Sequence, residues 1–229
     1  MPRNLHLTTS LTSVELARYT ARLLENHFPD GVTSGIDLRS DIDTALDRIE
    51  HCFSRIHRKY YRTDGVVSFD HLNSDHMAAY LYFLGNTIWR RTGDTALPTR
   101  LFYLNKVMHG IDLYFSVAMP EIFLLVHPVG TVVGAATYGD YLVLYQNCTL
   151  GADAGVYPTL GEGVILYSRT SVLGRSVVGD NVVFAANSFL VNTDVPSDSL
   201  VVGQFPSHRI RGNSTPVRYR LFESPPNGG

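Results

Sequence analysis

The chain has few of the residues that mark disulfide-rich, nucleic-acid-binding or membrane-spanning proteins. Its 229 residues include two cysteines, and the 19 basic and 21 acidic residues leave a net charge of -2 without a block of like charge. This balance gives no indication of a nucleic-acid partner. No apolar run approaches a membrane span, and residues 1–11 lack the apolar core of a signal peptide. We therefore expect a cytoplasmic protein with no nucleic-acid and no membrane partner.

The two cysteines, Cys52 and Cys148, lie far apart in sequence and in segments of different character. They indicate buried, reduced thiols rather than a disulfide framework. A chain of this length with 45% hydrophobic residues can bury a full core and form one large domain or two smaller ones.

A period of six residues dominates the second half of the sequence. A large apolar residue returns at every sixth position, and the series is Leu160, Leu166, Val172, Val178, Phe184 and Leu190. Such a period is typical of a solenoid in which each hexad forms one short strand and a corner, and three hexads close one coil. Glycines at 151, 161, 174 and 179 suit the corners, where a positive φ or a close backbone approach is needed.

The first hundred residues have a helical rhythm instead. Residues 12–15, Thr-Ser-Val-Glu, form a plausible capping box, and apolar residues recur at spacings of three and four over residues 42–60. Further helices are expected from about residue 75 and from about residue 97 to Gly110. We predict an α+β multidomain chain with a helical domain over 1–109, a parallel β-helix of hexapeptide repeats over 110–212, and an extended tail over 213–229.

One interval breaks the early part of the coil. Leu150 and Leu160 are ten residues apart rather than six, and residues 152–158 between them are expected to form a projecting loop. Loops that leave a rigid scaffold often carry functional residues. A passive excursion is the alternative.

His127 is the histidine placed beside these early coils, and Asp112 precedes it by fifteen residues. With coils of about eighteen residues, the two positions can come close on adjacent coils. A neutral imidazole can take a proton from a hydroxyl group, and a carboxylate on its other nitrogen fixes the tautomer. A structural histidine next to Pro128 is the alternative.

The combined pattern resembles the bacterial serine acetyltransferases of the hexapeptide-repeat acyltransferase superfamily. The resemblance covers roughly residues 80–210. It includes Gly-Ile-Asp at 110–112, His-x-x-Gly-x-Val-Val-Gly from His127, Gln-Asn-Cys-Thr-Leu-Gly at 146–151, and Asp-Val-Pro at 194–196. It implies a left-handed β-helix, an acetyl-CoA-dependent O-acetyltransferase activity, His127 as the catalytic base and Asp112 as the residue that orients it.

Departures from the family concern the hydroxyl acceptor. Val126 stands where the family has an aspartate that contacts the amino group of serine, and Val156-Tyr157 replaces its Arg-His pair. A zwitterion beside valines would lose its charge partners, which is costly in a closed site. Asp153 is a possible replacement, and Tyr157 would line an apolar pocket. The acceptor is therefore either serine, held by other residues, or a different small-molecule alcohol such as a sugar or a natural-product intermediate.

The resemblance also implies the donor site and the assembly. Acetyl-CoA would lie in a groove between the neighbouring solenoids of a homotrimer, or of a dimer of trimers, as a co-substrate and without a metal. Small residues at Ala185, Ala186 and Gly203 would allow the pantetheine to approach the backbone, and Arg209 and Arg211 would meet the phosphates. Cysteine synthase is not an expected partner, because the chain ends Pro-Asn-Gly-Gly rather than in isoleucine.

Two other functional classes remain open at this point. A non-catalytic hexapeptide scaffold or ligand-binding protein would show no dependence on His127 and no binding of CoA. A zinc hydratase built on the same coil would need three converging histidines, whereas the solenoid supplies only His127 and His208.

Overall fold

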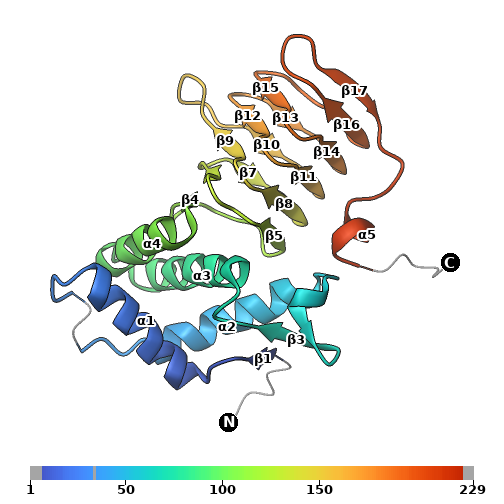
Figure 1. Cartoon of the computed structure of the whole chain (residues 1–229). Coiled ribbons are helices and arrows are strands. Elements are labelled where there is room, and N and C mark those ends of the chain that lie inside the picture. The colour runs from blue at the N-terminus through green and yellow to red at the C-terminus, as the bar shows by residue number, and fades with distance from the viewer. Residues whose placement is uncertain (1–6, 33–34, 224–229) are drawn as a thin grey trace. The chain divides into compact units, whose positions relative to one another are not determined.

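The computed structural model describes residues 7–32 and 35–223, which form two compact units (Figure 1). The first unit takes the chain as far as Ser54 and then Lys59–Ser116, and the second takes Arg55–Arg58 and the chain from Val117 onward. The second unit therefore includes a short segment from the N-terminal half of the sequence. The division falls after Ser116, seven residues beyond the expected boundary, because Asp112–Leu113 (β4) remains with the helices.

The first unit is mainly helical, as predicted. Thr12 caps the first helix through a complete capping box, in which its hydroxyl accepts the N–H of Glu15 and the Glu15 carboxylate accepts the N–H of Thr12. Gly93 and Gly110 end the third and fourth helices with positive φ. The helices are α1 (Ser13–His27), α2 (Arg39–Ser54), α3 (Ser74–Thr92) and α4 (Ala96–His109).

Two features of the first unit differ from the expectation. The helical periodicity over residues 42–60 extends beyond α2, which ends at Ser54, so that Ile56 lies in the second unit. A three-stranded sheet was also not expected, and it has the order β1-β3-β2 with β1 parallel to β3. Its strands are β1 (Leu7–Thr9), β2 (Arg62–Thr63) and β3 (Val66–Phe69), and a 3-10 turn, η1 (Lys59–Tyr61), precedes β2.

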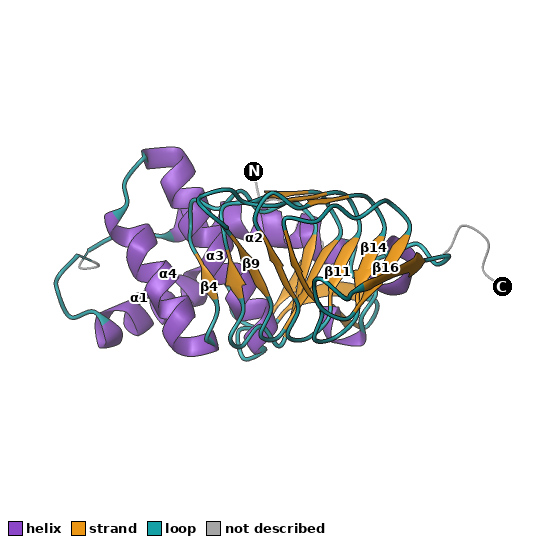
Figure 2. Cartoon of the chain, turned by 90° about the horizontal axis from the view of Figure 1, so that it is seen from above, coloured by secondary structure: helices purple, strands orange, loops and turns teal. Residues whose placement is uncertain are grey.

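The second unit is the predicted parallel β-helix, and Figure 2 shows its strands stacked along the coil. Equivalent strands of successive coils pair in register, so that Leu166 lies beside Phe184 and Val172 beside Leu190. Within this unit the three sheets have the orders β13-β10-β7, β15-β12-β9-β6 and β17-β16-β14-β11-β8-β5. The strands are β5 (Phe123–Val126), β6 (Val132–Val133), β7 (Thr137–Tyr138), β8 (Leu142–Tyr145), β9 (Thr149–Gly151), β10 (Thr159–Leu160), β11 (Val164–Leu166), β12 (Ser171–Leu173), β13 (Val177–Val178), β14 (Val182–Phe184), β15 (Phe189–Val191), β16 (Ser199–Val202) and β17 (Arg209–Gly212).

The residues of the six-residue period form the core of the coil. All six, from Leu160 to Leu190, are at most 2% exposed, which confirms that they point inward. Small polar residues complete the interior, and their hydroxyls donate to backbone carbonyls, as Thr170 does to Ala185 and Ser176 to Leu173. Buried hydroxyls are tolerated there because each has a hydrogen-bond partner.

The corners use asparagine as well as glycine. Asn147, Asn181, Asn187 and Asn192 adopt positive φ, a conformation that asparagine tolerates better than most residues. Gly179 serves the other purpose that we expected of glycine, since a Cβ there would lie 2.6 Å from the backbone nitrogen of Ser197.

The end of the chain differs from the expected extended tail. Strand β17 runs antiparallel to β16 and ends the coil, and residues 213–223 then pack against the same unit. They include a short helix, α5 (Arg218–Leu221), whose flanking Val217 and Phe222 are at most 1% exposed. The physical reason is apolar burial, since the Phe222 ring contacts the Tyr141 ring at a centroid distance of 5.2 Å. Residues 224–229 lie outside the described part.

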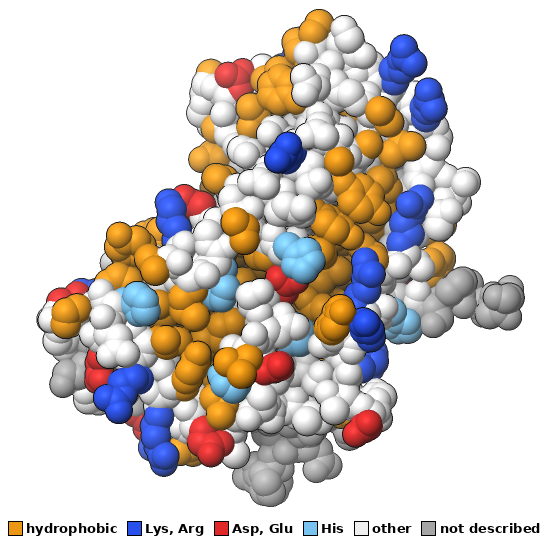
Figure 3. All heavy atoms as spheres, viewed as in Figure 1, with side chains coloured by type: hydrophobic (Ala, Val, Ile, Leu, Met, Phe, Trp, Pro, Cys, Tyr) orange, Lys and Arg blue, Asp and Glu red, His pale blue; other side chains and the backbone are white. Residues whose placement is uncertain are grey.

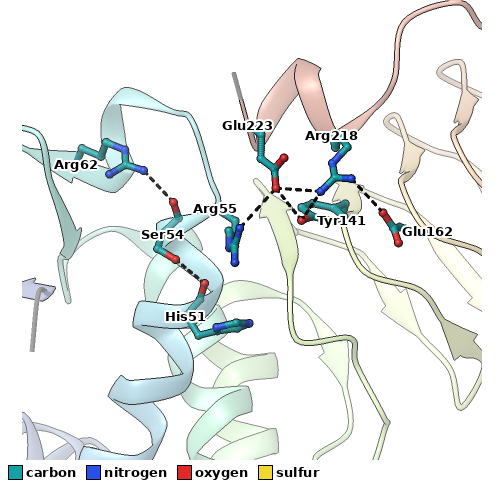
Figure 4. A network of polar contacts seen from close by, with 8 residues as sticks. All are labelled: His51, Ser54, Arg55, Arg62, Tyr141, Glu162, Arg218 and Glu223. Atoms are coloured by element: carbon teal, nitrogen blue, oxygen red, sulfur yellow. Dashed lines mark hydrogen bonds and ion pairs between the residues drawn. The ribbon is translucent and has the colours of Figure 1, made fainter. Parts of the chain in front are cut away.

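Segment 55–58 and the end of the chain are joined by polar contacts within the second unit (Figure 4). The N–H of His57 donates to the carbonyl of Leu221 at 2.8 Å, and the Arg55 guanidinium lies 3.6 Å from the Glu223 carboxylate. Glu223 also accepts hydrogen bonds from Tyr141 at 2.8 Å and from Arg218 at 3.1 Å. These contacts fix segment 55–58 on the coil.

Both cysteines are buried and neither is in a disulfide, as predicted. In the part of the chain that the structure describes, no helix has the length and the apolar character needed to cross a bilayer.

Candidate active site

His127 lies at a widened corner of the coil between β5 and β6. Val126 pairs with Tyr145 and Val132 with Thr149 on the next coil. Residues 127–131 join these paired positions in the first coil, whereas residues 146–148 are sufficient in the second. The insertion makes room for a turn that the regular corners do not have.

The backbone of this turn presents His127 to solvent. His127 has a φ of +49°, its carbonyl accepts the N–H of Val129 at 2.7 Å, and the carbonyl of Pro128 accepts the N–H of Thr131 at 3.1 Å. Histidine is among the residues that enter the left-handed region more often than most. The residue is exposed, so its imidazole can meet a ligand.

Asp112 lies in β4 of the first unit, whereas His127 belongs to the second. Within its own unit the Asp112 carboxylate accepts a hydrogen bond from the Lys106 ammonium at 2.6 Å. Lys106 was not singled out from the sequence, although it lies only six residues from Asp112. The pairing of Asp112 with His127 stays a prediction.

Residues 152–157 leave the coil, as predicted, but as a tight hairpin. Asp153 and Val156 exchange two backbone hydrogen bonds of 3.0 Å, and Ala154 and Gly155 between them both have positive φ. This is the two-residue type I′ turn that matches the twist of paired strands. The Asp153 carboxylate accepts a hydrogen bond from the Asn192 amide at 2.6 Å. Asp153 is thus already engaged within the chain.

Tyr157 packs on the strand side of the coil. A Cβ at Gly134 would lie 2.6 Å from the Tyr157 ring, so glycine is required where the ring lies on the backbone. Gly134 follows β6 and His127 precedes it. Within one chain the structure therefore separates Tyr157 and Asp153 from the Val126–His127 corner by the length of β6.

The expected donor-binding residues lie on the later coils. Ala185 follows β14 and is partly exposed, Ala186 is exposed, and Gly203 follows β16 with a φ of +90°. Arg209 and Arg211 are exposed on β17, which is an antiparallel end strand and not a further coil. As alternate residues of a strand, the two guanidinium groups lie on the same face.

Two tyrosines beside the His127 corner were missed by the sequence analysis. Tyr145 and Tyr167 form a ring pair with a centroid distance of 4.9 Å and an interplanar angle of 38°. Burial raises the pKa of Tyr145, nearby Tyr167 raises it further, and Arg58 acts in the opposite direction. The six-residue period could have revealed the pair, because each tyrosine directly follows an inward-pointing leucine.

In the described residues there is no group of three or more His, Cys, Asp or Glu side chains placed to hold a metal ion.

Comparison with known proteins finds serine acetyltransferases among the relatives of this chain. A serine acetyltransferase of Synechococcus elongatus is 33% identical over 112 residues, which are 47% of this chain and 46% of that protein. Serine acetyltransferase 2 of Arabidopsis thaliana is 31% identical over 189 residues, 79% of this chain and 53% of that protein. The chain thus spans about half the length of the curated relatives it matches. No protein-family model matches the chain.

Solved structures share the fold at low sequence identity. Serine acetyltransferase from Vibrio cholerae superposes with a TM-score of 0.64, at 22% identity, over 91% of this chain and 93% of its own. Serine acetyltransferase from Brucella abortus in complex with coenzyme A gives a TM-score of 0.59 at 22% identity, over 87% and 74% of the two chains. The chain is thus similar in sequence to serine acetyltransferases over part of their length, and it shares the fold of the solved ones.

Proposed function

We propose that the chain is an acetyl-CoA-dependent O-acetyltransferase in which His127 is the general base. The observation that carries the proposal is the widened corner, which presents an exposed imidazole on a rigid coil. Support for the donor comes from the serine acetyltransferases, among them the Brucella abortus protein in complex with coenzyme A.

The chemistry follows from a neutral imidazole at that corner. One nitrogen of His127 takes the proton of the acceptor hydroxyl while the hydroxyl oxygen attacks the thioester carbonyl carbon. The tetrahedral intermediate then collapses, the C–S bond breaks, and the imidazolium returns the proton to the departing thiolate. A general base of this kind contributes about 10²–10⁴-fold to the rate. Asp112 has the proposed role of orienting the imidazole and stabilising the imidazolium.

The acceptor we favour is an alcohol other than free serine. Val126 adjoins His127 and is aliphatic, and Val156 and Tyr157 give the hairpin an apolar side. Asp153, the carboxylate that could have met an ammonium group, accepts a hydrogen bond from Asn192. An ammonium group beside aliphatic Val126 would gain no charge partner from that side chain, and an unpaired charge in a closed site is costly. L-serine remains the competing acceptor.

The donor site and the assembly are proposed together. Ala185, Ala186 and Gly203 would border the pantetheine, and Arg209 and Arg211 would meet the phosphates. A homotrimer, or a dimer of trimers, would place the hairpin of one copy beside the His127 corner of another. Hairpin and corner, which lie apart within one chain, would then form one site. Sedimentation of the purified chain tests this assembly, because it measures whether the particle has the mass of a trimer or of a dimer of trimers. We retain the cytoplasm as the proposed compartment, which suits two cysteines that form no disulfide.

The test is thiol release from acetyl-CoA with L-serine, with other alcohols and without acceptor. The variants are His127→Ala and Asp112→Asn. We expect release that needs an acceptor and falls about 10²–10⁴-fold in His127→Ala while coenzyme A still binds. Release with L-serine as the best acceptor would contradict our choice of acceptor but not the activity. No release with any alcohol, together with no binding of coenzyme A, would point to a non-catalytic scaffold.

A further inference from the structure

A group of side chains beside His127 is not used by the chemistry proposed above. We call Arg58, Val126, Tyr145 and Tyr167 the corner platform; all four belong to the second unit. Figure 3 shows apolar side chains gathered on the coil, with Lys and Arg side chains along their edge.

The register of the coil places the two tyrosines next to the His127 corner. Val126 pairs with Tyr145, and the pairing of Leu144 with Leu166 puts Tyr167 next in the same row. Neighbouring strands lie about 4.8 Å apart. The tyrosines are therefore one and two strand spacings from Val126, the residue before His127.

The tyrosine rings face outward and are accessible. Each directly follows a fully buried leucine, and successive side chains of a strand point to opposite sides. Both tyrosines are partly exposed, and their rings are in contact at 4.9 Å. A partly exposed ring pair offers a flat apolar surface on which a planar group can stack.

Arg58 adds a positive charge at the edge of this surface. Its side chain is exposed, and its positive charge acts to lower the pKa of Tyr145. The segment that carries it is fixed, since Ile56 is fully buried and the N–H of His57 donates to Leu221. Among the residues that the structure describes, no carboxylate lies within ion-pair distance of Arg58. A guanidinium that is carried by a fixed segment and has no carboxylate partner is suited to bind an anionic ligand group.

We propose that the corner platform selects the acceptor, which is a hydroxyl-bearing carboxylate with a planar apolar group and no free ammonium. Arg58 binds its carboxylate, the tyrosine pair binds its planar part, and aliphatic Val126 adjoins the hydroxyl that His127 deprotonates. Gln146, next to Tyr145, has a buried Oε1 without a hydrogen-bond partner in the described chain, which an amide N–H of such a ligand would satisfy. This inference rests on the proposed function of the same corner.

The experiment compares four acceptors in the thiol-release assay with the full chain. They are N-acetyl-L-serine, N-benzoyl-L-serine and the primary amide of each, so that charge and ring vary independently. We expect the lowest KM for N-benzoyl-L-serine. Arg58→Gln should raise that KM about 10-fold or more and leave the KM of the amides unchanged. Tyr167→Ala should raise the KM of the two benzoyl compounds about 2–10-fold and leave the acetyl compounds unchanged.

Arg175→Gln is the matched control, because Arg175 is an exposed arginine at another corner of the coil. Equal effects of Arg58→Gln on acids and amides would overturn the proposal, as would a raised KM for acetyl-CoA with unchanged acceptor values. If no alcohol supports release, the proposed function fails, and calorimetry with N-benzoyl-L-serine tests the platform alone. Binding that weakens in Arg58→Gln would then support it, and absence of binding would refute it.

Discussion

Acidification from about pH 6.5 to pH 4 should destabilise the first unit in large part through His76. The residue is 0% exposed and lies among the rings of Phe53, Tyr61 and Phe69, at centroid distances of 4.9, 4.4 and 6.2 Å. Its Nδ1 accepts the N–H of Asp70 at 3.1 Å. Burial lowers the pKa of His76 from 6.5 to about 4, because the charged imidazolium would lose its hydration.

The sign and size of the effect follow from proton linkage. Above pH 6.5 His76 is neutral in both the folded and the unfolded chain. As the pH falls, the unfolded chain binds a proton that the folded chain does not, so stability is lost between about pH 6.5 and pH 4. At 1.36 kcal/mol for each pH unit, the loss approaches about 3 kcal/mol. Burial also lowers the pKa of His109 to about 4, so this residue adds a loss of the same sign.

The assay is denaturant unfolding at several pH values, followed by the fluorescence of Trp89 in α3 of the same unit. In His76→Asn the side-chain oxygen can still accept the N–H of Asp70, but the titrating group is removed. We expect the slope of its unfolding free energy against pH to be smaller, because about one proton fewer is bound on unfolding. Phe53→Leu is the control, because it loosens the same cluster and should lower stability without changing this slope. Parallel pH profiles of the wild type and His76→Asn would refute the reasoning.

Two further predictions concern the second unit. Phe222→Ala should lower the unfolding free energy by about 3–5 kcal/mol, because it empties a fully buried site against the Tyr141 ring. Thermal unfolding measures this loss. An unchanged unfolding temperature would show that the C-terminal segment does not pack there. Gly174→Ala should lower the unfolding free energy, measured with denaturant, by about 1 kcal/mol or more. The reason is that φ is +69° and the new Cβ would meet the Asn192 side chain. An unfolding free energy equal to that of the wild type would contradict this strain.

The site was predictable from the sequence only where its residues are local in the chain. His127 stands out because it follows an apolar strand and precedes Pro128 and two valines, and the ten-residue interval after Leu150 predicted the excursion that became the hairpin. The sequence could not show that Asp153 is engaged with Asn192, since that contact joins different coils. Nor could the sequence show that Tyr157 lies away from His127, because their distance depends on the strand against which the Tyr157 ring packs.

Local patterns by themselves determined the coil and the helices of this protein. A period of six residues places one inward side chain on each of the three sides of a coil. Thr12 and Glu15, three residues apart, set the start of α1. Only the tertiary structure decided where segment 55–58 belongs. A helical spacing suggested that Ile56 continues α2, yet burial in the second unit, with His57 bonded to Leu221, outweighs the short-range preference. Apolar burial is non-directional and acts between residues distant in sequence, so no local pattern announces it.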